Sequence, residues 1–185
     1  MIIPSFLFLK YSSTALILFN VPKKFTLNTF SICSTSISFS FFGTVNSIKA
    51  VEQYYRERKN GIITIVSSIA GYRGLPNSTG YGPSKSALNN LAESLYFDFQ
   101  RFNVRVCLVS PGFIKTPMTD KNDFKMPFLK TPEFAADQIY DGLINKNVFE
   151  IHFPKALTLT LKFFSFLPSK LYFKLVGKMT KHQKK

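Results

Sequence analysis

The sequence has few of the residues that bind metals or form disulfides. Its 185 residues include two cysteines and two histidines, and none of the four lies close to another in the chain. A zinc site needs several such ligands at short spacings, so we expect no metal site. Cys107 lies in the apolar segment VRVCLVS, where a buried, reduced thiol is the ordinary interpretation.

Acidic residues are missing from both ends of the chain. Residues 1–50 contain four lysines and no acid, and residues 151–185 contain eight lysines and no acid. The middle, residues 51–150, carries twelve basic and ten acidic residues, so the net charge of +14 belongs mainly to the ends. A nucleic-acid-binding protein would carry its basic stripe through the folded part, so we expect no nucleic-acid partner. Contact with a membrane surface, or simple solubility, explains the basic ends better.

Glycine and long apolar runs are both missing from residues 1–42. The apolar residues near the start are interrupted by Lys10 and by the polar residues 11–13, so neither run is long enough to span a membrane. A signal peptide would have positive charge before its apolar run, and no charged side chain precedes it here. Residues 29–42 (TFSICSTSISFSFF) show no helical period. We therefore treat residues 1–42 as an atypical segment.

From Gly43 onward, helical periodicity alternates with short apolar runs. Leu88, Ala92 and Phe99 recur at helical spacing, whereas segments such as IITIVSS are continuous and β-branched, as in strands covered on both faces. Short links between such elements indicate parallel strands with right-handed crossovers in a doubly wound α/β sheet. The expected elements are a helix from 43 to about 60, a strand 62–68, a loop 69–80, a helix 81–102, a strand 104–110, a helix 131–145 and a strand 148–153.

Two tyrosines precede a lysine by four residues, which places each pair on one face of a helix. Tyr55 and Lys59 fall in the last turn of a surface helix, where a lysine near the final carbonyls is expected. The helix that opens at Tyr81 starts from the edge where the strands end, and ligands bind at that edge. Ser68 closes the preceding strand. We therefore expect Ser68, Tyr81 and Lys85 to converge on one crevice.

The segments IITIVSSIAGYRG, YGPSK and LVSPGFIKT resemble, in this order, the catalytic half of the short-chain dehydrogenase/reductase family. Ser68 stands thirteen residues before Tyr81, the usual position of the family's serine. The resemblance covers residues 43–150 and implies an NAD(P)-dependent oxidoreductase. Such an enzyme transfers a hydride between a nicotinamide cofactor and an alcohol or carbonyl substrate.

The resemblance also implies roles for individual residues. A phenol with an ordinary pKa near 10 is a poor proton donor at neutral pH, so Lys85 would lower the pKa of Tyr81, the acid/base. Lys85 would also hold the cofactor ribose, and Ser68 would donate a hydrogen bond to the substrate oxygen. The residues implied in cofactor binding are Tyr81, Lys85, Pro111, Gly112, Ile114 and Thr116.

Simpler roles for the same residues stay open. Ser68 and Thr116 could be caps of local structure, and Pro111–Gly112 could be a turn. Residues 117–131 correspond to the family's substrate loop, and a packed surface loop is the alternative. Its apolar side chains suggest an apolar substrate: Met118, Met126, Phe128 and Leu129.

One part of the family pattern is missing. The family begins with a strand and a glycine-rich turn that binds the cofactor pyrophosphate, and this chain has no glycine before Gly43. We therefore expect a Rossmann-like sheet truncated at its N-terminal side, with weak or absent binding of NAD or NADP. An inactive remnant or interaction module of that fold is the alternative. Residues 1–42 read like out-of-frame or unspliced sequence, a hypothesis that fails if no upstream frame encodes a glycine-rich βαβ unit.

The C-terminal residues 151–185 form a basic, aromatic extension. Residues 153–185 combine phenylalanines and leucines with interspersed lysines, as in helices that lie on anionic membranes. We expect this segment at the substrate entrance or on a membrane surface, and a helix pair packed on the domain is the alternative. A cytoplasmic location is expected otherwise, and both membrane association and a homo-oligomer stay open.

Overall fold

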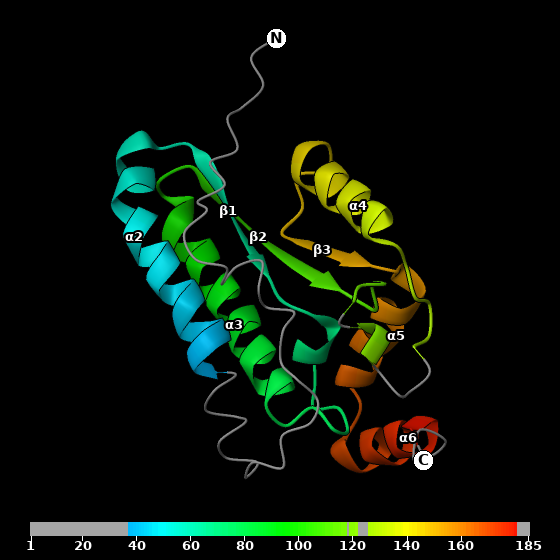
Figure 1. Ribbon diagram of the computed structural model, residues 1–185. Helices are drawn as coiled ribbons and strands as arrows, with labels where there is room; N and C mark the ends of the chain where they lie inside the picture. The colour runs from blue at the N-terminus through cyan, green and yellow to red at the C-terminus, as the bar shows by residue number, and fades with distance from the viewer. Residues whose placement is uncertain (1–36, 118, 122–125, 181–185) are drawn as a thin grey trace.

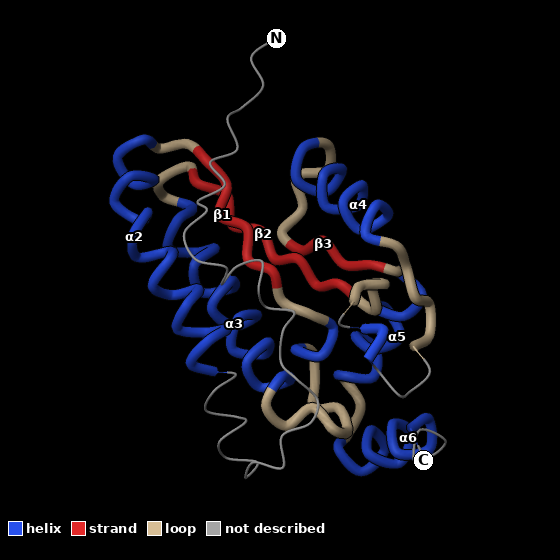
Figure 2. Tube along the Cα trace, viewed as in Figure 1, coloured by secondary structure: helices blue, strands red, loops and turns tan. Residues whose placement is uncertain are grey.

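The computed structural model describes residues 37–117, 119–121 and 126–180, so most of the atypical segment 1–42 lies outside the described residues. Three parallel strands form one sheet in the order β1-β2-β3. They are β1 (Gly61–Val66), β2 (Val104–Pro111) and β3 (Glu150–Phe153). Gly61 lies opposite Val104, and Leu108 lies opposite Glu150. Figures 1 and 2 show the strands side by side between the helices.

The described helices follow the sequence expectation closely from residue 43 to residue 153. A π-helical turn, η1 (Ile37–Phe42), leads into α2. The loop expected at 69–80 contains a short 3-10 turn, η2 (Ile69–Gly71), and a second one is η3 (Thr119–Lys121). The α-helices are α2 (Gly43–Arg58), α3 (Tyr81–Gln100), α4 (Pro132–Ile144), α5 (Lys155–Ser165) and α6 (Ser169–Thr180).

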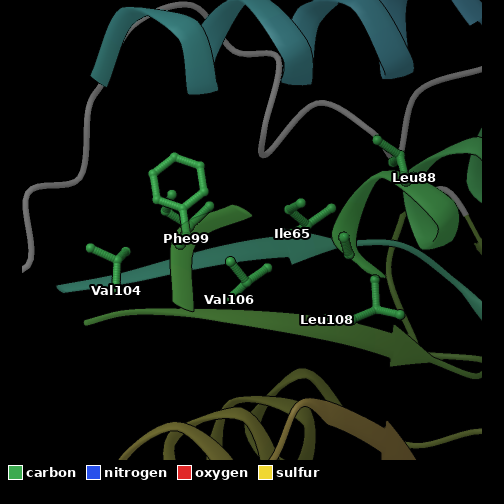
Figure 3. Packing of buried hydrophobic residues seen from close by; sticks show 8 residues of the cluster. Ile65, Leu88, Phe99, Val104, Val106 and Leu108 are labelled. Atoms are coloured by element: carbon green, nitrogen blue, oxygen red, sulfur yellow. The ribbon is translucent and has the colours of Figure 1, made fainter. Parts of the chain in front are cut away.

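One face of the sheet is covered by α3, with α2 beside it (Figure 1). The buried stripe of α3 consists of Leu88, Ala92 and Phe99, as its spacing predicts. These side chains pack on β1 and β2, and Figure 3 shows Leu88 and Phe99 against the strand residues. Truncating a buried leucine such as Leu88 to alanine typically costs about 2–5 kcal/mol, so this layer fixes α3 firmly on the sheet.

The other face is covered by α4. Leu143 of α4 packs with alternate residues of the strands, including Val109 and Ile151. Helices on both faces of a parallel sheet confirm the doubly wound α/β fold. With the order β1-β2-β3 and α3 and α4 on opposite faces, the two crossovers have opposite hands. The expectation that both are right-handed is therefore wrong for one of them, because packing on the far face overrides the usual preference.

The C-terminal residues fold as two helices, α5 and α6, which we call the C-terminal helix pair. The first packs against β3, and the buried side chains of the pair include Leu157 and Tyr172. The alternative of a helix pair packed on the domain is thus the one observed, and its outer surface is considered below. No helix in the described ranges combines the length and apolar character needed to cross a membrane.

Candidate active site

Two segments leave the sheet at one edge, after β1 and after β2. β1 ends at Val66, which lies opposite Val109 of β2, and the backbone N–H of Ser67 donates to the Val109 carbonyl at 2.8 Å. Because the strands are parallel, the residues that follow β1 and β2 emerge at the same edge. The pair Ser67–Ser68 follows β1, and Gly112 follows β2. This edge is where doubly wound sheets bind ligands.

Two contacts hold the start of α3 against this edge. The Ser67 hydroxyl donates a hydrogen bond of 3.0 Å to the Lys85 carbonyl. Gly71 lies against the same turn of α3, where an added Cβ would be 2.8 Å from the Lys85 carbonyl carbon and 2.9 Å from Asn89 Nδ2. Sequence reasoning missed both roles. The sequence did contain one indication of the close packing at Gly71, because a glycine three residues after Ser68 suggests that two backbone segments approach closely there.

Ser68 caps its own loop and influences the pKa of Tyr81. Its oxygen accepts a hydrogen bond from the Ala70 N–H at 3.2 Å and so caps η2, as the simpler interpretation held. Burial raises the pKa of Tyr81 above 10.0, and a hydrogen bond with Ser68 opposes this shift. The pKa direction is therefore opposite to the one expected from Lys85, because burial outweighs the other influences on the phenol.

Lys85 is 1% exposed and lies beside Tyr81 on the first turns of α3. Its Nζ is 5.6 Å from the centroid of the Tyr81 ring and donates to the Val66 carbonyl at 3.1 Å. Burial lowers the pKa of Lys85 to about 8. Among the described residues, the Val66 carbonyl is the one hydrogen-bond acceptor found for this ammonium, which carries three donor protons. A ligand with hydroxyl groups, such as a ribose, fits this spare donor capacity.

The segment after β2 is held by β3 and by local bonds. The Gly112 N–H donates to the Phe153 carbonyl at 2.7 Å, and a Cβ on Gly112 would lie 3.0 Å from Pro154 Cδ. Gly112 is thus closely packed against Pro154, and Pro111 is the last residue of β2. Thr116 and Thr119 hydrogen-bond to each other, their hydroxyls being 3.3 Å apart. This local pairing with Thr119 was not anticipated, and it satisfies Thr116 without a ligand.

The expected substrate loop is closed at its base. Ile114 is buried and forms a bridge with Lys130, and the Lys115 N–H donates to the Lys130 carbonyl at 2.7 Å. Near this base, Phe128 is 55% exposed and Leu129 is 40% exposed. Of the loop residues singled out from the sequence, Met118 lies outside the described residues. The loop thus presents apolar side chains next to the segment that follows β2.

The second tyrosine–lysine pair lies at the opposite end of the sheet. Lys59 is the C-cap of α2, with its backbone N–H bonded to the Tyr55 carbonyl at 3.0 Å. It precedes Gly61, where β1 begins, whereas Ser68 follows the end of β1. The expected separation of the two pairs is confirmed. No group of histidine, cysteine, aspartate or glutamate in the described ranges could hold a metal ion.

Comparison with known proteins agrees with this architecture. The family model of the short chain dehydrogenases matches residues 20–126, more than half of the chain, so the protein belongs to the short-chain dehydrogenase family. The roles of individual site residues stay a prediction, as does the division of the chain at residues 42 and 150.

The matches to individual relatives cover only part of each relative's length. An uncharacterized oxidoreductase of Myxococcus xanthus is 35% identical over 130 residues, which are 70% of this chain and 51% of the relative. A 3-ketodihydrosphingosine reductase of Bacteroides thetaiotaomicron is 39% identical over 90 residues, or 49% of this chain and 34% of the relative. The chain therefore spans about half the length of the first relative, and about a third of the second.

A solved structure shows the same fold. A short chain dehydrogenase from Burkholderia cenocepacia, in complex with NADP, superposes with a TM-score of 0.64 at 24% identity. The match covers 74% of this chain and 55% of that one.

Proposed function

We propose that the chain carries the catalytic residues of an NAD(P)-dependent oxidoreductase that interconverts an alcohol and a carbonyl compound. The observation that supports this most is the grouping at one sheet edge: Ser68 follows the end of β1, the Lys85 Nζ lies 5.6 Å from the centroid of the Tyr81 ring, and Lys85 is buried one turn beyond Tyr81 on α3. In the order Ser68, Tyr81, Lys85, each residue type has the chemistry that proton transfer to a carbonyl oxygen requires.

Each residue has a distinct part in the proposed reaction. A nicotinamide cofactor, when bound, supplies or accepts the hydride. Tyr81 donates the phenol proton to the substrate oxygen in the reductive direction and takes it back in the oxidative one. Ser68 donates a hydrogen bond to the same oxygen while negative charge develops there. Lys85, as an ammonium beside the Tyr81 ring, stabilises the phenolate that Tyr81 becomes when it donates its proton.

The nicotinamide end of the cofactor would be held by Lys85 and by the segment Pro111, Gly112, Ile114 and Thr116. The spare donor protons of Lys85 suit ribose hydroxyls, and the segment after β2 leaves the sheet beside them. We expect weak affinity for NAD or NADP in this chain, because no glycine-rich turn precedes Gly43 to hold the pyrophosphate. Losing two or three charge-assisted hydrogen bonds, each worth about 1.5–3 kcal/mol, would weaken binding by roughly 10²- to 10⁶-fold.

The proposed substrate is a small apolar alcohol or carbonyl compound. Phe128 and Leu129, next to the bridge between Ile114 and Lys130, present apolar surface near the segment after β2. One relative is named for the reduction of 3-ketodihydrosphingosine.

The proposal is tested with the 185-residue chain and high concentrations of NADH or NADPH. Cofactor binding is followed by fluorescence and turnover is measured with a panel of apolar ketones. Tyr81→Phe is expected to abolish turnover and to leave the fold and cofactor binding largely intact. Tyr55→Phe is the control and is expected to behave like the wild type. If the Tyr81→Phe variant turned over substrate at the wild-type rate, Tyr81 would not be the acid/base. A folded chain that shows no turnover at cofactor concentrations where binding is detected would contradict the enzyme and favour an interaction module.

A further inference from the structure

The C-terminal helix pair has a buried inner side and an unusually apolar outer side. Leu157, Tyr172 and Val176 face the domain and are buried. On α5 the exposed residues Leu159 and Phe163 lie four positions apart on one face, and Phe166 follows directly after the helix. We use the name outer face for the exposed surface of the helix pair, whose large apolar residues are Leu159 (55%), Phe163 (64%), Phe166 (86%), Leu171 (44%), Phe173 (66%) and Met179 (57%). On α6, Leu171 and Phe173 lie two positions apart and therefore on separate flanks of the helix.

These side chains are exposed although the helix pair is firmly attached to the domain. The Arg73 guanidinium donates hydrogen bonds to three carbonyls at the end of α5, including that of Leu167 at 2.6 Å. It also lies 4.1 Å from the centroid of the Tyr172 ring, and the Tyr172 hydroxyl donates to the Gly74 carbonyl at 2.8 Å. The helix pair is thus fixed on the loop that follows Ser68, and its orientation is determined.

A second contact fixes α5 independently. Glu150 of β3 forms an ion pair with Lys162 of α5, and it accepts a hydrogen bond from the Tyr72 hydroxyl at 2.7 Å. Lys162 is therefore engaged with the domain and does not contribute a free charge to the outer surface.

The free charges on the helix pair are all positive. Lys170, Lys174 and Lys178 are exposed and recur every four residues, so they form one row along α6. No aspartate or glutamate follows Glu150 in the sequence. Two copies of this surface would bring like charges together, whereas an anionic surface would attract the row. Aromatic and aliphatic side chains with interspersed lysines are the composition of helices that lie in the interface of anionic bilayers.

We infer that the outer face of the C-terminal helix pair docks on the surface of an anionic phospholipid bilayer. Phe163 and Phe166 enter the boundary between headgroups and acyl chains, and Lys170, Lys174 and Lys178 contact lipid phosphates and carboxylates. The contact is peripheral and needs no membrane-spanning segment. It stands on the surface of α5 and α6 and does not depend on the proposed oxidoreductase activity.

The test is flotation of the 185-residue chain with phosphatidylcholine vesicles made with and without phosphatidylserine. The wild type is expected to float with the vesicles that contain phosphatidylserine and much less with the others. Lys170→Gln/Lys174→Gln/Lys178→Gln is expected to reduce partitioning about a hundredfold, since each cation near an anionic bilayer contributes about a factor of five. Phe163→Ser/Phe166→Ser is expected to reduce partitioning about tenfold or more.

Matched controls carry the same changes on other faces. Phe97 on α3 and Tyr140 on α4 are 72% and 60% exposed, and Phe97→Ser/Tyr140→Ser is expected to leave partitioning unchanged. Lys49→Gln/Arg58→Gln/Lys59→Gln removes three cations from α2 and its cap, and it should also have little effect. Thermal melting followed by circular dichroism checks that each variant is folded.

Three results would overturn the inference. The first is wild-type flotation that is absent, or equal with and without phosphatidylserine, and this result needs no variant. The second is equal losses in the outer-face variants and their controls. The third is self-association that Phe163→Ser/Phe166→Ser abolishes while flotation stays unchanged, which would make a second copy of the chain the occupant.

Discussion

The hydroxyl of Ser67 donates a hydrogen bond to the backbone carbonyl of Lys85, which ties the end of β1 to the beginning of α3. Ser67 is 2% exposed, so water could not easily replace its hydroxyl as the hydrogen-bond donor to the Lys85 carbonyl. This bond sets the distance between the strand that ends before Ser68 and the helix that carries Tyr81 and Lys85. A neighbour of the proposed catalytic serine thus acts as a positioning residue.

Replacing this serine tests the link. Ser67→Ala is expected to lower the free energy of unfolding by about 1–2 kcal/mol, because a buried carbonyl loses one of its hydrogen bonds. Urea denaturation measures the change. Ser94→Ala is the control: the Ser94 hydroxyl makes a bond of 3.0 Å to the Asn90 carbonyl on the exposed side of α3, and its loss should cost less than about 0.5 kcal/mol. Equal losses in the two variants would contradict the positioning role.

A pair of nearby glycines provides a second test. Gly71→Ala is expected to destabilise the protein by about 1–3 kcal/mol, because its Cβ would meet backbone atoms of Lys85 at 2.8 and 2.9 Å and displace α3. An added Cβ at Gly74 meets nothing within 4 Å, so Gly74→Ala should be neutral or slightly stabilising. Thermal unfolding of the two variants side by side decides the matter, and a tolerated Gly71→Ala would show that α3 is not closely packed there.

The buried ammonium of Lys85 predicts a pH dependence of stability. Its pKa falls from 10.5 to about 8 on folding, so between those pH values the unfolded chain binds more protons and stability rises with pH. The difference corresponds to roughly 3 kcal/mol, fully gained only near pH 10.5. Lys85→Met removes this penalty, so its stability relative to the wild type should be most favourable near pH 7 and should decline as the pH approaches 10.

Denaturation of the two proteins at a series of pH values measures this difference. Burial also raises the pKa values of Tyr72 and Cys107, but these groups are common to both proteins and cancel in the comparison. A constant difference between pH 7 and pH 10 would show that the Lys85 ammonium is not destabilised by burial.

Arg73 attaches the C-terminal helix pair to the loop that follows Ser68. Arg73→Ala should cost about 2–4 kcal/mol and expose α5 and α6 to limited proteolysis, because several charge-assisted hydrogen bonds to their carbonyls are lost. Arg73→Lys should rescue only part of the loss, since an ammonium cannot reproduce the planar fork. Arg101→Ala, which removes an arginine that stacks on Phe102 at 4.9 Å, is the control and should leave the cleavage pattern unchanged.

Local pattern was enough to predict the elements from α2 to β3. Leu88, Ala92 and Phe99 recur at helical spacing because they face one sheet, and the continuous apolar strands reflect cover on both faces. The meeting of Ser68, Tyr81 and Lys85 also followed, since parallel strands end at one edge. These features depend on short stretches of sequence and on general rules of sheet packing.

Features that depend on distant contacts were not predictable in the same way. No local pattern indicates that Arg73 would contact carbonyls more than ninety residues away, or that Tyr72 would reach Glu150. The pKa of Tyr81 was misjudged because its burial depends on how α3 packs, which the spacing of Tyr81 and Lys85 does not reveal. The opposite hands of the two crossovers likewise depend on which face α4 covers.

The contact between Arg73 and Leu167 spans 94 positions of the chain and encloses α3, β2, α4, β3 and α5. Contacts between such distant residues carry a large loop-closure entropy and tend to form late in folding. During synthesis, the loop after Ser68 would wait for its support until α5 and the start of α6 had emerged from the ribosome. Completion of the loop beside Tyr81 would then follow the synthesis of the residues up to the start of α6.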